Sequence, residues 1–563
     1  MSSNCKKISD KIQQFIKSAE NGESVYIYEV RDTFEDIDSK VECIIETSIN
    51  DVKKWQVPIP YVQSEEEKKF IENYFYSNIY NILSTYGGKQ MTLCVPPDEK
   101  HIGELCYALN DIFQVNSKRI DRYGYGKCLN VTDRINAAFG HPPFKFYVTN
   151  EKIITKKENS GRNENKDVIS EYRKTVKAAS DKILIGLDIG GTDIKAIGTV
   201  NGCIKAIAEY DWNPAGMTRI EQMTAGIKNV MQEICDKLGK ANIPDGVGVG
   251  FPDVVVMNKI VGGETLKTIG IRKASPDYES EFAKLLDLNE ILLGYCKQNA
   301  VIQMTNDGSL AAYTAAVELA HSNRCGEVKH GIFAHTLGTE LGTGWVDRSG
   351  QIPQIPLEIY NCVVDLGNYP AREFKPFDLR STLNFSTKIA GTMQKYASQS
   401  GAYRLAVEYF SKDDPKLFKE LFSRCFVEEK NNGIYVVVSP TDMRKPLLEY
   451  IMMLAEEGQP QAEKIFTEIG RHLAATWREV EFLLNPAAKE RILYGRFVKS
   501  QKCLDLMRKG ANEIKKITQK AGDDSLAFTP LMNELKENPN YTVAQFGQAI
   551  GAIHFIAGIL DKD

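Results

Sequence analysis

The sequence predicts an α/β protein of several domains, and three observations lead to this fold class. The chain has 563 residues, a length that corresponds to about three or four domains. From residue 182 onward, short apolar runs that stop at glycines alternate with longer stretches of helical periodicity, as in sheets whose strands are joined by helices. Residues 1–155 carry a separate set of predicted strands and helices, so we expect an additional N-terminal domain.

The composition is that of a globular protein without strong charge. Lys and Arg total 70 and Asp and Glu total 74, and 43% of the residues are hydrophobic. These values exclude disordered and fibrous classes, and the near balance of charge implies no general affinity for nucleic acid or membranes. The 12 cysteines include no Cys-x-x-Cys pair and no zinc-ligand spacing, so we expect reduced thiols, a cytoplasmic location and no zinc. The longest apolar stretch, Gly551–Leu560, is too short to span a membrane.

The N-terminal domain, residues 1–155, is predicted to be α/β or α+β. A polar N-terminal helix is followed by alternating stretches typical of strands and by two stretches of helical spacing. The predicted strands are Ser24–Val30, Val41–Thr47, Met91–Val95 and Phe144–Val148, and the predicted helices are Glu65–Tyr86 and His101–Phe113. The domain lacks the short helices and basic face of a helix-turn-helix DNA reader, and none of its motifs indicates a chemistry.

A charged, polar run at residues 156–166 has almost nothing to bury. Residues 156–181 are therefore predicted to be an exposed linker that becomes helical toward its end. Such a boundary predicts that the chain from about residue 181 onward folds by itself. The alternative is that the N-terminal domain packs tightly on the rest and covers a large apolar patch.

The remainder of the chain alternates between strands and helices. Buried strands are predicted where short apolar runs meet turns, and helices where apolar residues recur every three or four positions. The predicted strands are Ile183–Asp188, Ala196–Val200, Ala206–Tyr210, Gly246–Phe251, Val301–Thr305 and Gly331–Thr336, and the predicted helices are Ile220–Leu238 and Leu310–Ala320. Beyond residue 385 helices predominate.

The first motif that indicates chemistry follows the strand Ile183–Asp188. Its residues read Asp188-Ile-Gly190-Gly191-Thr192-Asp193-Ile-Lys195. The glycines permit a tight turn with bare backbone N–H groups, which suit phosphate oxygens, and Thr192 adds a hydroxyl donor. Asp188 at the strand end is placed to hold the water shell of Mg²⁺. The alternative is a hairpin turn with incidental glycines.

Two further motifs also follow predicted strands. Thr336-Leu-Gly338-Thr339-Glu340-Leu-Gly342-Thr343-Gly344 alternates Gly and Thr, which offers a second cradle of N–H and hydroxyl groups or simply a glycine-kinked hairpin. Thr305-Asn306-Asp307-Gly308 places a carboxylate where it can take the proton of an attacking hydroxyl. The same residues also make a good turn and helix cap.

The order and spacing of the three motifs resemble sugar kinases of the actin/hexokinase/Hsp70 superfamily, and within it the ROK family (repressors, uncharacterised frames and sugar kinases). The resemblance covers residues 182–560 and leaves out the N-terminal domain. Further along it is carried by Ala455-Glu-Glu-Gly458, Ile469-Gly-Arg-His-Leu-Ala474, Leu483-Leu-Asn-Pro486, Ile492-Leu-Tyr-Gly495 and Ala549-Ile-Gly551-Ala552.

The resemblance implies two actin-like (ribonuclease H-like) lobes around a nucleotide cleft, each with a mixed five-stranded sheet. Lobe 1 would comprise residues 182–315 and lobe 2 residues 316–544, and a helix at residues 545–560 would pack back on lobe 1. The family also implies a homodimer and the cofactors ATP and Mg²⁺.

The resemblance further implies a role for individual residues. Asp307 would be the general base, and Asp188 would hold Mg²⁺ through water. The phosphates and the adenosine would contact Asp188, Gly190, Gly191, Thr192, Lys195, Gly338, Thr339, Gly342, Gly344 and Gly495. The sugar would contact Asn306, Glu358 and Asn361.

The sequence departs from the family pattern at several of these places. Glu340 adds a negative charge beside the phosphates, which opposes ATP unless a cation is near. Asn361 stands where the family has His, and Cys362 stands alone where the family has a zinc-binding cluster. Pro252-Asp253 replaces a Pro-Gly turn, and Gly495-Arg496 replaces a double glycine.

Three functions fit the sequence. The leading one is an ATP- and Mg²⁺-dependent kinase for a hydroxyl of a sugar or related polyol, with no nucleic-acid or membrane partner. A sugar- or nucleotide-sensing regulator on a kinase scaffold is favoured by the substituted turns but does not need Asp307. An ATPase that drives a partner protein would need neither Asn306 nor Asp307.

Overall fold

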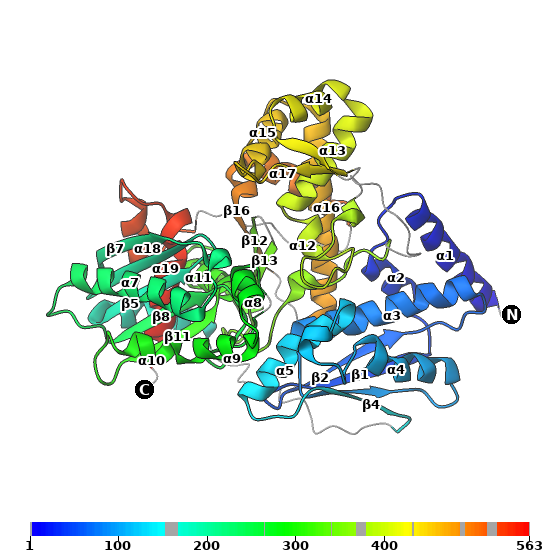
Figure 1. Cartoon of the computed structure of the whole chain (residues 1–563), viewed down its shortest axis with the longest axis horizontal. Coiled ribbons are helices and arrows are strands. Elements are labelled where there is room, and N and C mark those ends of the chain that lie inside the picture. Colours follow the sequence, from blue (N-terminus) through cyan, green and yellow to red (C-terminus); the bar gives the residue numbers. More distant parts are fainter. Residues whose placement is uncertain are drawn as a thin grey trace.

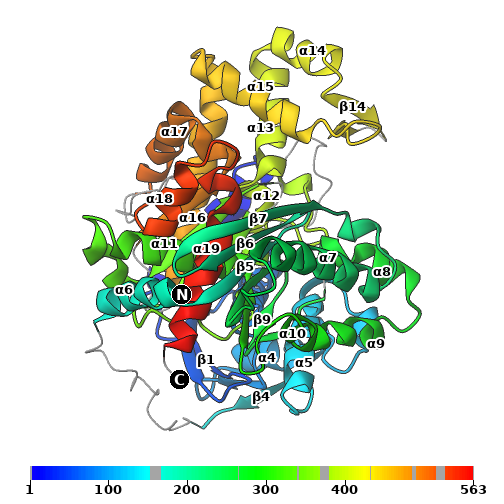
Figure 2. The same ribbon diagram turned by 90° about the vertical axis from the view of Figure 1, so that its left-hand side faces the viewer.

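The structure is a computed structural model that describes residues 3–151, 167–263, 265–338, 341–367, 379–430, 433–484, 490–514 and 526–561. The charged run at 156–166 and the predicted phosphate residues Thr339 and Glu340 lie outside this range. Three parts are seen in Figure 1: lobe 1 at the left, the N-terminal domain at the lower right, and lobe 2 between and above them. In Figure 2 the long helix α19 lies on one side of the lobe 1 sheet and α7 lies on the other.

The N-terminal domain is a four-stranded sheet with helices. Its sheet order is β2-β1-β3-β4, with β1 antiparallel to β2 and β3, and β4 parallel to β3. The elements are α1 (Ser3–Glu20), α2 (Ile27–Thr33), β1 (Lys40–Glu46), β2 (Val52–Pro58), α3 (Glu65–Tyr86), β3 (Gln90–Cys94), α4 (Lys100–Ile112), α5 (Cys128–Ala138) and β4 (Lys145–Thr149). The sequence analysis missed β2 and α5.

The predicted strand at Ser24–Val30 is wrong. Only Tyr26 makes a strand-like bridge, with Asp365, and helix α2 begins at the next residue. Ile27, Val30 and Arg31 are buried at a spacing of three and four, which is the spacing of a helix face. Contacts with a distant part of the chain therefore override the local alternation.

Lobe 1 contains a five-stranded mixed sheet of the ribonuclease H-like order. The order is β11-β8-β5-β6-β7, in which β5, β8 and β11 are parallel and β6 is antiparallel to both neighbours. The elements are α6 (Val168–Ala178), β5 (Ile183–Ile189), β6 (Asp193–Val200), β7 (Cys203–Asp211), α7 (Ile220–Leu238), β8 (Gly246–Phe251), β9 (Val255–Val256), β10 (Lys259–Ile260), α8 (Ile269–Ala274), α9 (Tyr278–Ala283), α10 (Leu288–Leu293), β11 (Val301–Asn306) and α11 (Asp307–Ala320).

Lobe 2 does not contain the predicted five-stranded sheet. In its described residues the sheet has three strands in the order β13-β12-β16, with β12 antiparallel to β13 and parallel to β16. A third hairpin strand after β13 would include Pro353 and Pro356, which cannot donate a backbone hydrogen bond. The chain leaves the sheet there, and from Leu357 on it bonds to the N-terminal domain instead.

Helices make up most of lobe 2 and the C-terminal region. The elements are β12 (Ile332–Leu337), β13 (Leu341–Val346), α12 (Met393–Tyr396), α13 (Gln399–Asp413), α14 (Pro415–Ser423), β14 (Val427–Lys430), β15 (Gly433–Val436), α15 (Arg444–Glu456), α16 (Pro460–Leu483), β16 (Glu490–Gly495), α17 (Gln501–Asn512), α18 (Pro530–Lys536) and α19 (Val543–Leu560). Helix α6, within the predicted linker, and α18, within the range predicted for lobe 2, both pack on lobe 1 elements.

Helix α19 lies on the lobe 1 sheet at backbone distance. A Cβ atom at Gly186 of β5 would lie 1.9 Å from the carbonyl oxygen of Ala549, and one at Gly248 of β8 would lie 2.0 Å from that of Ala552. Within the described residues α19 is the one helix whose length and apolar composition would allow it to cross a membrane. Here its apolar residues pack on lobe 1, so its composition is explained by a core position.

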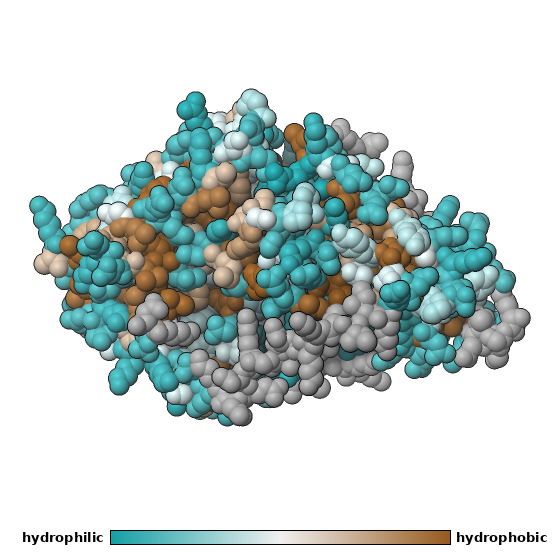
Figure 3. All heavy atoms as spheres, turned by 90° about the horizontal axis from the view of Figure 1, so that it is seen from below, coloured by the Kyte–Doolittle hydropathy of each residue, from teal (hydrophilic) through white to brown (hydrophobic). Residues whose placement is uncertain are grey.

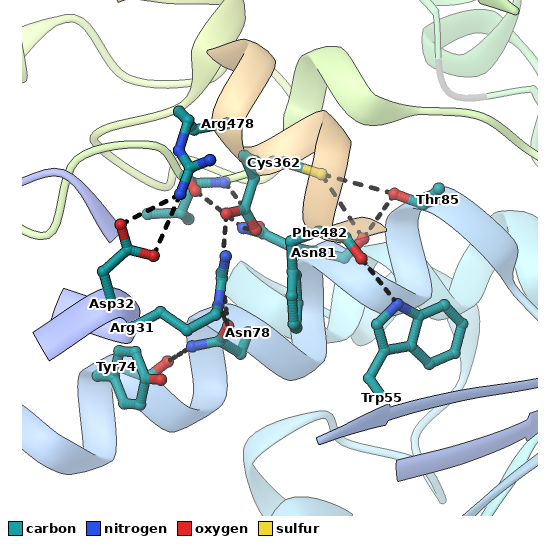
Figure 4. A network of polar contacts seen from close by, with 12 residues as sticks. Arg31, Asp32, Trp55, Tyr74, Asn78, Asn81, Thr85, Cys362, Arg478 and Phe482 are labelled. Carbon is teal, nitrogen blue, oxygen red and sulfur yellow. Dashed lines mark hydrogen bonds and ion pairs between the residues drawn. The ribbon is translucent and has the colours of Figure 1, made fainter. Parts of the chain in front are cut away.

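The N-terminal domain shares a hydrophobic cluster with lobe 2. The cluster runs without a break from α1 and α3 through β12 to α16 and α17. Buried polar contacts cross the same boundary (Figure 4): Arg31 pairs with Glu479 at 2.7 Å, and Trp55 Nε1 donates to the Phe482 carbonyl oxygen at 3.2 Å. The tightly packed arrangement that the sequence analysis left open is the one observed.

Figure 3 shows a face whose described residues are mainly polar. Seen from below, polar residues are spread over the face, and the largest apolar area lies at the lobe 1 end (Figure 3). Lobe 1 carries exposed large apolar side chains at Ile243, Met257, Leu286 and Leu293.

The close packing of α19 predicts that Gly248→Ala destabilises the protein by about 3 kcal/mol, since the new methyl group would meet backbone atoms that cannot move aside. Urea unfolding followed by tryptophan fluorescence measures this. Gly326→Ala is the matched control, because a Cβ there contacts nothing within 4 Å. Equal stability of the two variants would contradict the packing described here.

Candidate functional site

The first glycine motif forms the tight hairpin between β5 and β6. Gly190 N donates to the Asp193 carbonyl oxygen at 2.8 Å, and a Cβ at Gly190 would lie 2.9 Å from that oxygen. Trp212 Nε1 donates to the Gly190 carbonyl oxygen at 3.1 Å and fixes the turn from outside. Gly191 and Thr192 at its tip are exposed, so the turn can be approached by a ligand.

Asp188 lies at the end of β5, beside this hairpin. Its pKa is raised to about 7, mainly by burial; Lys195 opposes the rise, and the neighbouring carboxylates of Asp307 and Asp193 contribute to it. Lys195 is paired across from Asp188 in the β5–β6 register and forms an ion pair with Asp193. Lys195 therefore supplies positive charge to the strand end.

Asp307 begins α11 directly after β11. Asn306 caps this helix: its Oδ1 accepts from Gly308 N at 3.0 Å and from Ser309 N at 3.3 Å, and its Nδ2 donates to the Asp253 carbonyl oxygen at 3.0 Å. Burial raises the pKa of Asp307, and the nearby Lys267 opposes the rise. The sequence left open whether Asn306 caps a helix or binds a ligand, and its side chain does act as the cap.

Gly250 of β8 brings the two carboxylates together. A Cβ built there would lie 3.8 Å from Asp188 Oδ1 and 3.8 Å from the Asp307 Cα atom. Lys267 lies at the same place, because its Cε is 3.3 Å from a Cβ built at Gly191. The hairpin, both carboxylates and one lysine thus converge at the carboxyl ends of parallel strands, where α/β sheets bind ligands.

Lobe 2 faces this cluster with Glu358 and Tyr360. Tyr360 Oη donates to Glu358 Oε1 at 3.0 Å. The pKa of Tyr360 is raised well above its usual value, first by burial and then by the carboxylates of Glu358, Asp253 and Asp307. The predicted sugar residue Glu358 is thus brought to the same side as Asp307.

Asn361 is engaged inside lobe 2. Its Oδ1 accepts from Asn384 Nδ2 at 2.9 Å and from Gln394 Nε2 at 2.7 Å. The oxygen of this predicted sugar residue therefore holds lobe 2 segments together.

A cavity of about 770 Å³ lies at the carboxyl ends of β12 and β16. Its lining includes Thr336, Gly338, Gly495, Arg496, Lys499 and Gln548, so it joins two predicted nucleotide residues, Gly338 and Gly495, with two cationic side chains. Gln548 Oε1 is buried and has no hydrogen-bond partner within the described residues. Gly495 has a φ of 102°, and a Cβ there would lie 2.4 Å from the Leu337 carbonyl oxygen.

Two other predicted phosphate residues serve packing. A Cβ at Gly342 would lie 2.0 Å from Thr336 Oγ1, and one at Gly344 would lie 1.8 Å from the Gly308 carbonyl oxygen. Gly344 therefore lets β13 press against the start of α11. Thr339 lies outside the described residues.

Sequence reasoning missed Lys267, Tyr360 and the role of Asp253. Asp253 is buried, its Oδ1 accepts from Val254 N at 2.7 Å and its Oδ2 accepts from Gly263 N at 2.9 Å. Burial raises its pKa to about 6. Asp253 could have been found from the sequence, because it stands in the altered Pro252-Asp253 turn. Lys267 could not, because it belongs to no motif. Within the described ranges, no group of three or more His, Cys, Asp and Glu side chains is arranged to hold a metal ion.

Comparison with known proteins places ROK-family structures among those to which the chain is similar. No protein-family model and no curated protein matches it. The ROK hexokinase of Thermus thermophilus is 14% identical over 68% of this chain and 99% of its own, with a TM-score of 0.42. A ROK family glucokinase of Streptomyces griseus, solved with glucose and AMPPNP, is 17% identical over 66% and 98%, with a TM-score of 0.40. A ROK family transcriptional regulator, a homolog of the E. coli MLC protein, is 13% identical over 80% and 99%, with a TM-score of 0.43.

The raised pKa of Asp188 predicts that Asp188→Asn stabilises the protein at pH 8 in Mg²⁺-free buffer, by about 2–5 °C in Tm. A carboxyl whose pKa is raised on folding loses stability as the pH rises through that value, here about 7. The gain should therefore shrink at pH 5 and vanish below about pH 4, where the carboxyl is protonated in the folded and the unfolded protein alike.

Asp245→Asn is the control, with the opposite sign. Burial raises the pKa of Asp245, but the hydrogen bonds from Lys297 and from Ile183 N outweigh it, and the pKa is lowered. This variant should lose stability at pH 8. A Tm for Asp188→Asn that is no higher than wild type at pH 8 would contradict the burial of that carboxyl.

Proposed function

We propose that this protein is an ATP- and Mg²⁺-dependent kinase that transfers a phosphoryl group to a hydroxyl of a sugar or related polyol. The observation that carries the proposal is the convergence of Asp188, Asp307 and the Gly190-Gly191 hairpin at one edge of the lobe 1 sheet, opposite Glu358. Phosphoryl transfer needs positioned phosphates, a cation and a base for the attacking hydroxyl. A cytoplasmic location and a homodimer remain part of the proposal.

Asp307 would act as the general base. Its carboxylate is fixed at the start of α11 by Gly308 N, which donates to its Oδ1 at 2.8 Å. A raised pKa makes the carboxylate a better proton acceptor. It would take the proton from the acceptor hydroxyl as the oxygen of that hydroxyl attacks the terminal phosphorus, and the bond from that phosphorus to the bridging oxygen would break, with ADP as the leaving group.

The nucleotide would lie between the hairpin and the lobe 2 cavity. Gly190, Gly191 and Thr192 would hold phosphate oxygens on the lobe 1 side, with Lys195 nearby, and Gly338, Thr339, Gly342 and Gly344 belong to the lobe 2 segment. The adenosine would contact Gly495, and the unpartnered Gln548 Oε1 fits a donor such as an amino group. Arg496 and Lys499 add positive charge.

The carboxyl groups at the site fit a magnesium ion held through water. Mg²⁺ keeps several waters and takes one or two carboxylates, and Asp188 lies beside a second carboxylate, that of Asp307. When bound, the ion would neutralise charge on the phosphates. We propose no zinc site.

The acceptor would lie between Asp307 and Glu358. Glu358 would accept hydrogen bonds from sugar hydroxyls, with Asn306 and Asn361 at the edges of the same space. Closure of the lobes would exclude water as a competing acceptor.

A sensing protein on the same scaffold is the second candidate. It is favoured by one observation: Asn306 and Asn361 already use their side-chain oxygens within the protein, for the α11 cap and for Asn384 and Gln394. Such a protein would bind sugar or nucleotide without turnover.

Asp307→Asn should reduce turnover by about 10²–10⁴-fold, the usual contribution of a general base, while the affinity for AMPPNP is kept. The assay measures ADP release from the full chain with Mg-ATP, alone and with a panel of aldohexoses, N-acetylhexosamines and hexitols. Wild-type turnover that rises with one of these compounds is the kinase result.

Four other outcomes are informative. Binding without turnover favours the sensor, and turnover that ignores every acceptor favours an ATPase. An Asp307→Asn variant with near wild-type kcat would refute the assignment of the base. Activity restored after EDTA treatment only by zinc, and not by Mg²⁺, would contradict the metal assignment.

A further inference from the structure

The segment after β13 runs along the N-terminal domain and bonds to it repeatedly. These contacts are Leu357 N to Thr85 O at 2.9 Å, Glu358 N to Ser84 O at 3.0 Å, Val363 N to Asn81 Oδ1 at 2.8 Å and Leu366 N to Val25 O at 2.7 Å. In two of these hydrogen bonds the acceptor oxygen belongs to the last turn of α3. The backbone on both sides of the Leu357–Glu358 peptide bond is therefore set by a domain that the kinase-like motifs do not include.

Leu357 is held in an unfavourable conformation at this place. Its φ is 53°, in the left-handed region that residues with a Cβ seldom adopt. Its N–H is bound by Thr85 of α3, and its carbonyl oxygen accepts from Thr343 Oγ1 at 3.3 Å. These two bonds fix the direction in which the chain enters Glu358.

The N-terminal domain also contacts lobe 1, close to the turn that contains Asp253. Arg134 of α5 donates from Nη1 to the Gly262 carbonyl oxygen at 2.6 Å, and it pairs with Glu279 at 2.8 Å. The next residue, Gly263, donates to Asp253 Oδ2, and Asp253 in turn accepts from Asn306 through its carbonyl oxygen. Three hydrogen bonds thus connect Arg134 with Asn306, the cap of the helix that carries Asp307.

We propose that the N-terminal domain forms one wall of the acceptor site, with the last turn of α3 positioning Glu358 from lobe 2 and Arg134 positioning the Asp253 turn of lobe 1. This inference rests on the proposed function in one respect, since it takes Glu358 to bind the acceptor. Thr85, Gly87 and Arg134 are positioning residues that act through Glu358 and Asp253. Acceptor binding then depends on the N-terminal domain, and nucleotide binding does not.

Gly87→Ala tests the α3 contact. Gly87 has a φ of 59°, and a Cβ there would lie 3.1 Å from Pro356 Cγ and 3.3 Å from Thr132 Oγ1. The added methyl group would push α3 away from the segment that precedes Glu358. Gly124→Ala is the matched control: it lies in the same domain at a φ of 51°, but a Cβ there contacts nothing within 4 Å.

Four quantities are compared in the full chain: KM and kcat for the most active sugar of the panel, Kd for AMPPNP by calorimetry, and hydrogen exchange of residues 356–361. Gly87→Ala should raise KM by about tenfold, equivalent to about 1.4 kcal/mol of binding, and should speed exchange at 356–361. Its kcat and its Kd for AMPPNP should stay within about twofold of wild type. Gly124→Ala should match wild type in all of these quantities.

Arg134→Gln provides a second variant for the lobe 1 side. It removes the charge that pairs with Glu279 and should raise KM and speed exchange at residues 253–263, again without a change in AMPPNP affinity. If both Gly87→Ala and Gly124→Ala behave alike, or if AMPPNP affinity falls together with acceptor affinity, the wall proposal is wrong. If wild type phosphorylates no sugar, the proposed function fails, and the exchange comparison still decides whether α3 positions the Glu358 segment.

Discussion

The arrangement of the molecule depends on one buried carboxylate, that of Glu479 on α16. It is fully buried and is neutralised from the N-terminal domain: Arg31 donates to it at 2.7 Å and Asn81 at 2.9 Å (Figure 4). Leaving a buried charge without its partner costs about 3–5 kcal/mol. The contact therefore joins the long central helix of lobe 2 to the N-terminal domain through a buried pair that is costly to break.

The contact between Asn81 and Glu479 also connects the N-terminal domain and α16 to the candidate site. Asn81 binds Glu479 through Nδ2 and both backbone groups of Val363 through Nδ2 and Oδ1, so it links α16, α3 and the segment that begins at Leu357. That segment bonds to α3 at Leu357 and Glu358 and not to the lobe 2 sheet, so under the proposed function the N-terminal domain would take part in the acceptor site.

The local sequence pattern was sufficient to predict the helices and strands whose packing partners are near in the sequence. The helix Ile220–Leu238 and the strand Gly246–Phe251 were predicted with the bounds observed, because amphipathic spacing and a continuous apolar run are strong signals. The Gly190-Gly191 hairpin and Asp307 at a strand end could also be located. Ser24–Val30 could not, because its helical face is set by α16 more than 400 residues away. For the same reason no motif could show that Thr85 fixes the backbone before Glu358, or that Lys267 joins the carboxylates.

The union of the N-terminal domain with lobe 2 is tested most directly by cutting the chain between them. A specific protease site is introduced into the charged run at residues 156–166, and the cleaved protein is passed over a size-exclusion column in its native state. The account predicts that both pieces elute together as one species of the same size as the uncut protein, because the buried Arg31–Glu479 pair and the shared apolar cluster hold them. Elution as two separate soluble fragments would contradict it.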